Sequence, residues 1–225
     1  MKQGALCALA GLLSLGCPKT GSEGPAAVAD PLAEARSLVE AGKLDEALAR
    51  LQSNPDPESL YLQGLAWARK AETAPLPTPA PGTSVAPEWK PDEIRAIDLL
   101  ERAIEARPDL ASAHLALGQV LAPHAIERAE REAAAARRRK GKGAEVPPPP
   151  MEGPDASPER VVRAFQSAAQ GNASKAPVEA LIAFATKAGR LADADSGFQE
   201  LLRREREKPE PFIAYGDFLR EKKQD

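Results

Sequence analysis

Side chains that carry out chemistry are scarce in this sequence. Its 225 residues include only two cysteines and two histidines, His114 and His124. The histidines do not share a helical face at adjacent turns, and no paired Cys or His spacing suggests a zinc site. A glycine-rich phosphate loop and a Gly-x-Ser-x-Gly motif are also missing. We expect no cofactor, no metal, no small-molecule substrate and no enzyme activity, although a cell-wall enzyme stays open because glycoside chemistry needs only two carboxylates.

An excess of charge of one sign is also missing. The 30 Lys and Arg residues nearly balance the 33 Asp and Glu residues, so the formal net charge of −3 favours no class of partner. Aromatic residues make up only 4% of the chain, and none is interleaved with a basic run. Because binding of single-stranded nucleic acid combines basic residues with stacking aromatics, we expect no nucleic-acid partner.

One basic cluster stands out locally. It ends a segment that begins at Pro123 and whose early charges are acidic, at Glu127, Glu130 and Glu132. If this segment is a helix that starts at Pro123, its acidic residues lie near the positive N-terminal end and its basic residues near the negative C-terminal end, as the helix dipole favours. Glu127 lies four residues before Arg131, a spacing that allows an ion pair. The alternative is contact with anionic lipid headgroups or an envelope polymer. The cluster consists of Arg137, Arg138, Arg139, Lys140 and Lys142.

The N-terminal apolar run is short. Lys2 precedes an apolar stretch over residues 5–15, which is too brief to span a bilayer but suits a secretory signal over residues 1–16. A rival cleavage site at residues 27–29 lies far beyond the apolar stretch. Conventional secretion and an unprocessed cytoplasmic chain remain the alternatives.

The end of this signal resembles the lipobox of bacterial lipoproteins, although Ser14 and Leu15 depart from its usual residues. The resemblance implies that Cys17 is acylated, with palmitate for example, and becomes the first residue. Because Cys7 would leave with the signal, no disulfide could form. Residues 17–31, rich in Gly, Ser, Pro and Ala, would form a flexible tether. We expect a lipid-anchored protein of the cell envelope, at the outer membrane and facing the periplasm.

Small residues recur at a fixed distance. Ala96 and Gly118 stand 22 residues apart, as do Ala194 and Gly216. Small residues let helix axes approach closely, and Pro108 ends one helix before the next begins. With Leu100, Ala103, His114, Leu117 and Leu121, this segment resembles the tetratricopeptide repeat family. The resemblance implies an all-α, right-handed solenoid of stacked antiparallel helical hairpins over residues 32–225, and a scaffold that binds protein.

Other segments match the repeat in part, giving about three and a half hairpins. The departures include Gln63 where Leu is usual, Arg206 where Pro is usual, and a middle pair of helices over 161–169 and 178–188 that keeps only apolar spacing. An irregular α-helical bundle is the alternative fold. The matching residues are Leu60, Gly64 and Trp67; Ala47 and Leu51 after Gly42; Ala194 and Phe198 after Gly189; and Phe212, Tyr215, Gly216 and Leu219.

Two proline-rich stretches interrupt the repeats, at about residues 73–91 and 141–158. Gly64, Gly118 and Gly216 lie further apart than multiples of a 34-residue repeat would place them, and the two stretches account for the extra residues. Because proline cannot continue a helix, we expect disordered, extended spacer loops. A ligand for a proline-reading domain is the alternative.

The first helix of each hairpin has one face that packs on its partner helix and, one residue further on, a second stripe of residues. These second stripes predict a partner-binding groove. The alternative is that a proline-rich insertion anchored by Trp89 covers the groove. We expect the last helix to have a polar outer face and to complete the array. The groove residues are Tyr61, Leu65, Leu115, Gln119, Ile213, Asp217 and Arg220.

These features predict a non-catalytic, membrane-anchored scaffold of the bacterial envelope. It would hold a protein or peptide partner in the groove and assist envelope, secretion or pilus assembly, as lipoproteins with such repeats often do. A binder of an envelope polymer or an anionic lipid surface, through the basic cluster 137–142, is the second hypothesis.

Overall fold

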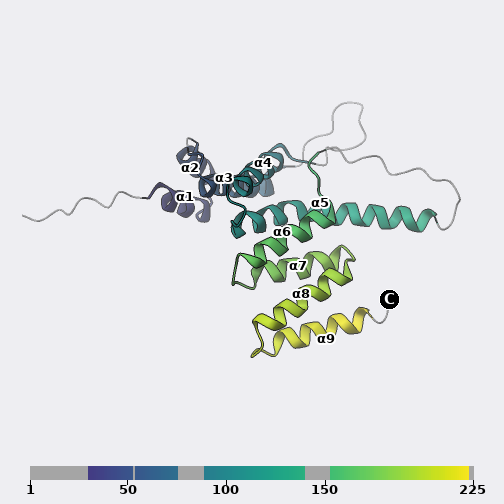
Figure 1. Cartoon of the computed structure of the whole chain (residues 1–225). Coiled ribbons are helices and arrows are strands. Elements are labelled where there is room, and N and C mark those ends of the chain that lie inside the picture. Colours follow the sequence, from purple (N-terminus) through teal and green to yellow (C-terminus); the bar gives the residue numbers. More distant parts are fainter. Residues whose placement is uncertain (1–29, 53, 76–88, 140–152, 223–225) are drawn as a thin grey trace, which may run out of the picture.

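The computed structural model describes residues 30–52, 54–75, 89–139 and 153–222, which form nine α-helices and no strand (Figure 1). The signal sequence, Cys17 and most of the tether lie outside these residues. The helices are α1 (Pro31–Glu40), α2 (Leu44–Leu51), α3 (Pro57–Thr73), α4 (Pro91–Ala106), α5 (Ala111–Arg139), α6 (Pro158–Gln170), α7 (Ala176–Lys187), α8 (Leu191–Arg204) and α9 (Glu210–Lys222).

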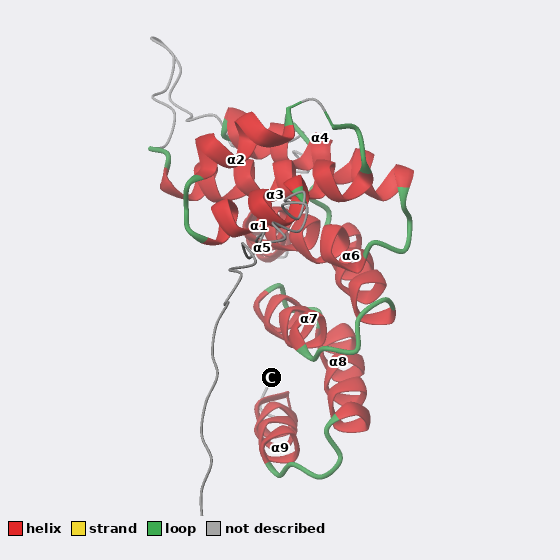
Figure 2. Ribbon diagram, turned by 90° about the vertical axis from the view of Figure 1, so that its left-hand side faces the viewer, coloured by secondary structure: helices red, strands yellow, loops and turns green. Residues whose placement is uncertain are grey.

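Successive helices pack as antiparallel hairpins: α1 with α2, α3 with α4, α5 with α6, and α7 with α8, while α9 packs on α8. Figure 2 shows α7 and α9 on one side of the stack and α6 and α8 on the other. The predicted all-α solenoid is thus confirmed, with four hairpins and a single helix. The expectation that the helices over 161–169 and 178–188 form one hairpin is wrong. Helix α6 is the second helix of one hairpin, and α7 is the first helix of the next.

Local sequence signals explain where the helices begin and turn. The carboxylates of Asp30 and Asp56 accept hydrogen bonds from the backbone N–H groups of the first turns of α1 and α3. Proline, which lacks the N–H that a first turn leaves unpaired, occupies the first turn of α1, α3, α4, α6 and α7. Gly42 and Gly189, with φ of 75° and 69°, make the turns before α2 and α8.

Close approach between hairpin helices depends on two glycines. A Cβ on Gly64 would lie 2.8 Å from Leu100 Cγ, and one on Gly118 would lie 2.6 Å from Phe165 Cε1. Both neighbours are buried, with Leu100 at 0% and Phe165 at 2% exposure. The glycines therefore create the space that these large side chains of α4 and α6 fill.

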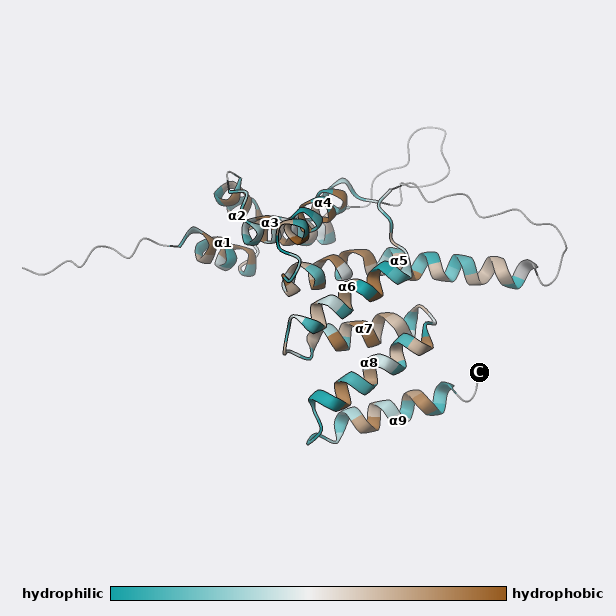
Figure 3. Ribbon diagram, viewed as in Figure 1, coloured by the Kyte–Doolittle hydropathy of each residue, from teal (hydrophilic) through white to brown (hydrophobic). Residues whose placement is uncertain are grey.

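Helix α5 corrects one prediction, because it runs through Pro123 instead of beginning there. Proline deprives only the carbonyl of Gln119 of its helical hydrogen bond, and both residues are exposed, so water can bind that carbonyl. The outer end of α5 projects beyond the other helices, and hydrophilic stretches alternate there with weakly hydrophobic ones in Figure 3. The expected Glu127–Arg131 ion pair is present, at 2.5 Å.

The ends of the two proline-rich stretches meet at Trp89. Its buried indole stacks on His124 of α5, with ring centroids 3.7 Å apart. A Cβ on Gly153 would overlap the Trp89 ring, so a residue of the second stretch also lies against the indole. Pro91 and Pro158 are first-turn helix residues and not loop residues as expected. The predicted spacer loops and the predicted cover of the groove fall on residues 76–88 and 140–152, which lie outside the described part of the chain.

Within the described ranges, no helix is long and apolar enough to cross a membrane.

Candidate protein-binding groove

A hollow of about 390 Å³ lies between the first helices α3 and α5, with one residue of α4 at its wall. We call it the α3–α5 groove. Two of the predicted residues, Leu65 and Gln119, come together here. Its lining residues are Leu65, Ala68, Arg69 and Glu72 of α3, Glu93 of α4, and Ala116, Gln119, Val120 and Pro123 of α5.

The apolar part of this groove follows from helical spacing. Leu65 and Ala68 are three residues apart on α3, and Ala116 and Val120 are four apart on α5, so each pair lies on one face of its helix. Leu65 and Val120 are half-buried, whereas Gln119 is exposed at the rim. The groove thus offers apolar surface to a side chain and an amide to a backbone.

The charged groups of the groove differ in how far they are already paired. The Arg69 guanidinium donates to the Val39 carbonyl at 2.5 Å, at the end of α1. The Glu93 carboxylate accepts from the Lys90 backbone N–H at 2.9 Å and lies 3.3 Å from Nε2 of His124. Glu72, by contrast, has no ion-pair partner among the described residues. Its exposed carboxylate remains available to a ligand.

Tyr61 and Leu115 lie beside the groove and do not line it. Both are half-buried and pack against the main core. Burial raises the pKa of the Tyr61 hydroxyl, while the charge of Arg36 and a hydrogen bond with Ser112 oppose that rise. These two residues therefore help to hold α3 against α5.

The remaining predicted groove residues lie on α9, at the other end of the stack (Figure 1). Ile213 is 64% exposed, and Asp217 and Arg220 form an exposed ion pair at 3.1 Å. They occupy on α9 the positions that Tyr61, Leu65 and Ala68 occupy on α3. Helix α7 lies between them and the α3–α5 groove.

Only part of the basic cluster is described. Arg137 is exposed near the end of α5, and Arg138 and Arg139 are its last residues. Lys140 and Lys142 lie outside the described residues, as does Cys17.

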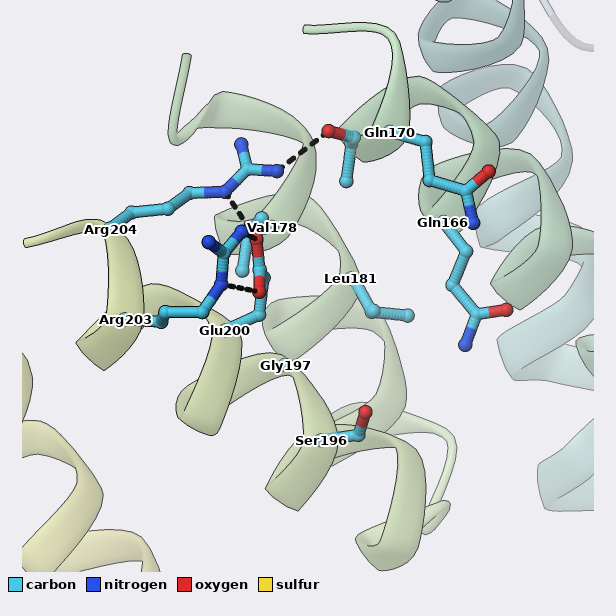
Figure 4. A pocket seen from close by; sticks show the side chains of 10 residues that line it. Gln166, Gln170, Val178, Leu181, Ser196, Gly197, Glu200, Arg203 and Arg204 are labelled. Carbon is cyan, nitrogen blue, oxygen red and sulfur yellow. Dashed lines mark hydrogen bonds and ion pairs between the residues drawn. The ribbon is translucent and has the colours of Figure 1, made fainter. Parts of the chain in front are cut away.

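A larger hollow, of about 550 Å³, lies between α6 and α8 (Figure 4). The Arg204 guanidinium there donates to the carbonyls of Ala169 and Asn172, at 2.6 and 2.9 Å, and so caps the end of α6. Hydrogen bonds from Arg203 and Arg204 lower the pKa of Glu200 to about 2. The sequence did not predict this hollow, although the paired arginines after Glu200 were a visible signal.

A similar hollow recurs one hairpin earlier, between α4 and α6, where Arg160 pairs with Glu101. Because both lie between successive second helices, where side chains of neighbouring hairpins meet, helix packing accounts for them. We therefore place the candidate site at the α3–α5 groove. No cluster of metal-ligating residues occurs in the part of the chain that the structure describes.

No protein-family model and no curated protein matches the chain. Among solved structures, a thermophilic TPR protein of Thermus thermophilus is similar over 85% of this chain and 82% of its own, with 15% identity and a TM-score of 0.54. MamA 41-end from Desulfovibrio magneticus RS-1 shares 16% identity over 86% of each chain, with a TM-score of 0.49. The Thermus likeness agrees with the stacked hairpins, and it shows that this chain has the tetratricopeptide-repeat fold.

Proposed function

We propose that this protein is a non-catalytic scaffold that holds a peptide or helix of a protein partner in the α3–α5 groove. The observation that carries the proposal is the groove itself, where apolar Leu65, Ala68 and Val120 lie beside Gln119 and the carboxylate of Glu72, which has no ion-pair partner among the described residues. A few polar groups around an apolar hollow suit a segment that inserts an apolar side chain and is oriented by hydrogen bonds.

The partner segment should carry a large apolar residue next to a basic one. The apolar side chain would cover Leu65 and Val120, and the basic one would reach Glu72 at the open edge. Arg69 is held by the carbonyl of Val39 and would contribute a fixed wall. An exposed ion pair adds little affinity, so Glu72 would set the orientation of the segment and the apolar contact its affinity.

The proposed location rests on the sequence alone. The apolar stretch before Cys17 supports a lipid anchor at the outer membrane, facing the periplasm, with the helical repeats held near the surface by the tether. A scaffold in that place would assist envelope, secretion or pilus assembly.

The second candidate is a binder of anionic lipid or an envelope polymer. It is favoured by the projection of α5 beyond the stack, since this helix ends with three residues of the basic cluster, Arg137, Arg138 and Arg139 (Figure 1).

Site-specific photo-crosslinking in membranes tests the proposal. A photoreactive residue at Gln119 should crosslink one partner, and Leu65→Glu, which places a charge in the groove, should abolish that crosslink. A photoreactive residue at Gln170, in the α6–α8 hollow, is the matched control and should give no crosslink to that partner. Crosslinks from Gln119 that persist with Leu65→Glu, or that appear equally from Gln170, would overturn the proposal.

A further inference from the structure

The first helices α3 and α5 each have a face that the second helix of the same hairpin covers. At its centre lies a glycine. The Cβ that Gly64 lacks would meet Leu100 Cγ at 2.8 Å and the carbonyl oxygen of Ala96 at 3.2 Å, both on α4. The Cβ that Gly118 lacks would meet the Phe165 ring of α6 at 2.6 Å. In both hairpins a large side chain from the second helix occupies the space above the glycine.

Helix α9 carries the same pattern, and none of the other helices in the described ranges covers it. Phe212, Gly216 and Leu219 repeat the spacing of His114, Gly118 and Leu121. A Cβ added to Gly216 would meet no other described atom within 4 Å. We call Phe212, Gly216 and Leu219 the open face of α9.

The open face is apolar, which corrects the expectation of a polar outer face. Phe212 is 51% exposed and Leu219 is 36% exposed. Exposed apolar side chains that lie together on one face of a helix can mark an interaction site, and here they flank the glycine that a second helix covers in the hairpins of α3 and α5.

A different face of α9 fixes it to the stack. The rings of Tyr215 and Phe218 lie 5.4 and 5.0 Å from that of Phe198 on α8. The Tyr215 hydroxyl donates to the Asp195 carboxylate at 2.8 Å. Tyr215 and Phe218 therefore hold α9 in position, and the three residues of the open face take no part in these contacts.

The charges around the open face favour an acidic occupant. With 3.6 residues per turn, Arg220 lies about 70° around α9 from the centre of the open face, whereas the acidic residues lie about 130° away or more. The ion pair of Arg220 with Asp217 is highly exposed, so the guanidinium can turn to another carboxylate at little cost. The acidic residues of α9 are Glu210, Asp217 and Glu221.

The chain itself contains a helix of the required kind. Helix α4 places Ala96 and Leu100, four residues apart, over Gly64. It is also acidic, with five Asp and Glu residues against two Arg residues. These properties are what a helix needs in order to fit a face with a central glycine, flanking apolar side chains and a basic edge.

We propose that the open face of α9 docks one acidic amphipathic helix of a protein partner, which takes the place of a second helix and completes the hairpin. A second copy of this chain fits less well. In a head-to-tail arrangement the second copy would place its α1 next to α9. Helix α1 is the first helix of a hairpin, whereas α9 lacks the second helix of its hairpin. This site is separate from the α3–α5 groove, so the two proposals can fail independently.

A peptide with the sequence of residues 91–106 is the probe, carrying a fluorescent label and blocked ends. Its binding to the full chain is followed by fluorescence anisotropy. We expect saturable binding that Gly216→Leu weakens at least about tenfold, because the leucine fills the space that the peptide must enter. Ala214→Leu adds the same side chain to the exposed opposite side of α9 and should leave binding unchanged. A peptide whose five acids are replaced by Asn and Gln should bind several-fold more weakly.

Three results would overturn the proposal: no saturable binding, equal binding by wild type and Gly216→Leu, or loss of binding with Leu65→Glu instead of Gly216→Leu. Sedimentation velocity of the chain alone supplies a further test. A concentration-dependent dimer that Gly216→Leu abolishes would identify a second copy as the occupant and would also overturn it.

Discussion

The repeat glycines lead to a prediction in which one substitution has opposite effects at different places. Replacing a helical glycine by alanine in open space stabilises a helix by roughly 0.5–1 kcal/mol, because the unfolded chain loses freedom and the helix gains propensity. At Gly216 nothing lies within 4 Å of the added Cβ. Gly216→Ala should therefore increase the free energy of unfolding by about 0.5–1 kcal/mol, with fraying of α9 reducing the gain.

At Gly118 the same change meets the Phe165 ring at 2.6 Å, about 1 Å closer than a normal carbon–carbon contact. Phe165 is 2% exposed and cannot turn out to solvent. Overpacking of this kind costs about 1–3 kcal/mol, so after the helix gain Gly118→Ala should destabilise the protein by roughly 1–2 kcal/mol. Gly64→Ala should also destabilise, since the Ala96 carbonyl cannot move aside as a side chain can.

Urea unfolding followed by far-ultraviolet circular dichroism measures this difference. We expect Gly216→Ala to be more stable than Gly118→Ala by about 2 kcal/mol, which exceeds the error of such comparisons. Equal stability of the two variants, or a more stable Gly118→Ala, would refute the account of why small residues lie at the helix crossings.

Three further predictions concern the anchor and the charged groups. Cys17→Ala should abolish labelling by a palmitate analogue, whereas equal labelling of wild type and variant would exclude lipidation at this residue. Because the pKa of Glu200 falls from 4.5 to about 2 on folding, its stabilising contribution is present above pH 4.5 and is lost as pH falls toward 2. The urea midpoint of wild type should therefore drop more than that of Glu200→Gln over this range, and parallel curves would contradict the assignment. Arg204→Ala should lower the free energy of unfolding by about 1–3 kcal/mol because the carbonyls at the end of α6 lose their donor, and hydrogen exchange at residues 169–174 should rise; an unchanged exchange pattern would contradict the capping role.

Sequence patterns predicted the fold where small residues mark helix crossings. Ala96, Gly118 and Ala194 are fully buried or nearly so, and the segments around them form the expected helices. These positions are readable because a close crossing admits almost no other residue type. Gly42 and Gly189 were informative for a similar reason, since each turn needs a positive φ.

Other features depend on tertiary surroundings and could not be read locally. Pro123 signals a helix start, yet its exposed position lets α5 continue through it. Phe212 and Leu219 match buried repeat positions, so the pattern says nothing about whether a covering helix is present. Leu65 and Gln119 were identified as groove residues from their stripe, whereas Glu72 and Glu93 were missed because their position depends on how α3, α4 and α5 pack.

Hydrogen–deuterium exchange of the full chain, with and without its crosslinked partner, tests the central claim most directly. If a partner lies in the α3–α5 groove, backbone amides around residues 65–72 and 116–123 should exchange more slowly in the complex, while those of α6 and α8 stay unchanged. Slower exchange confined to residues 127–139, or to the α6–α8 hollow, would contradict the claim.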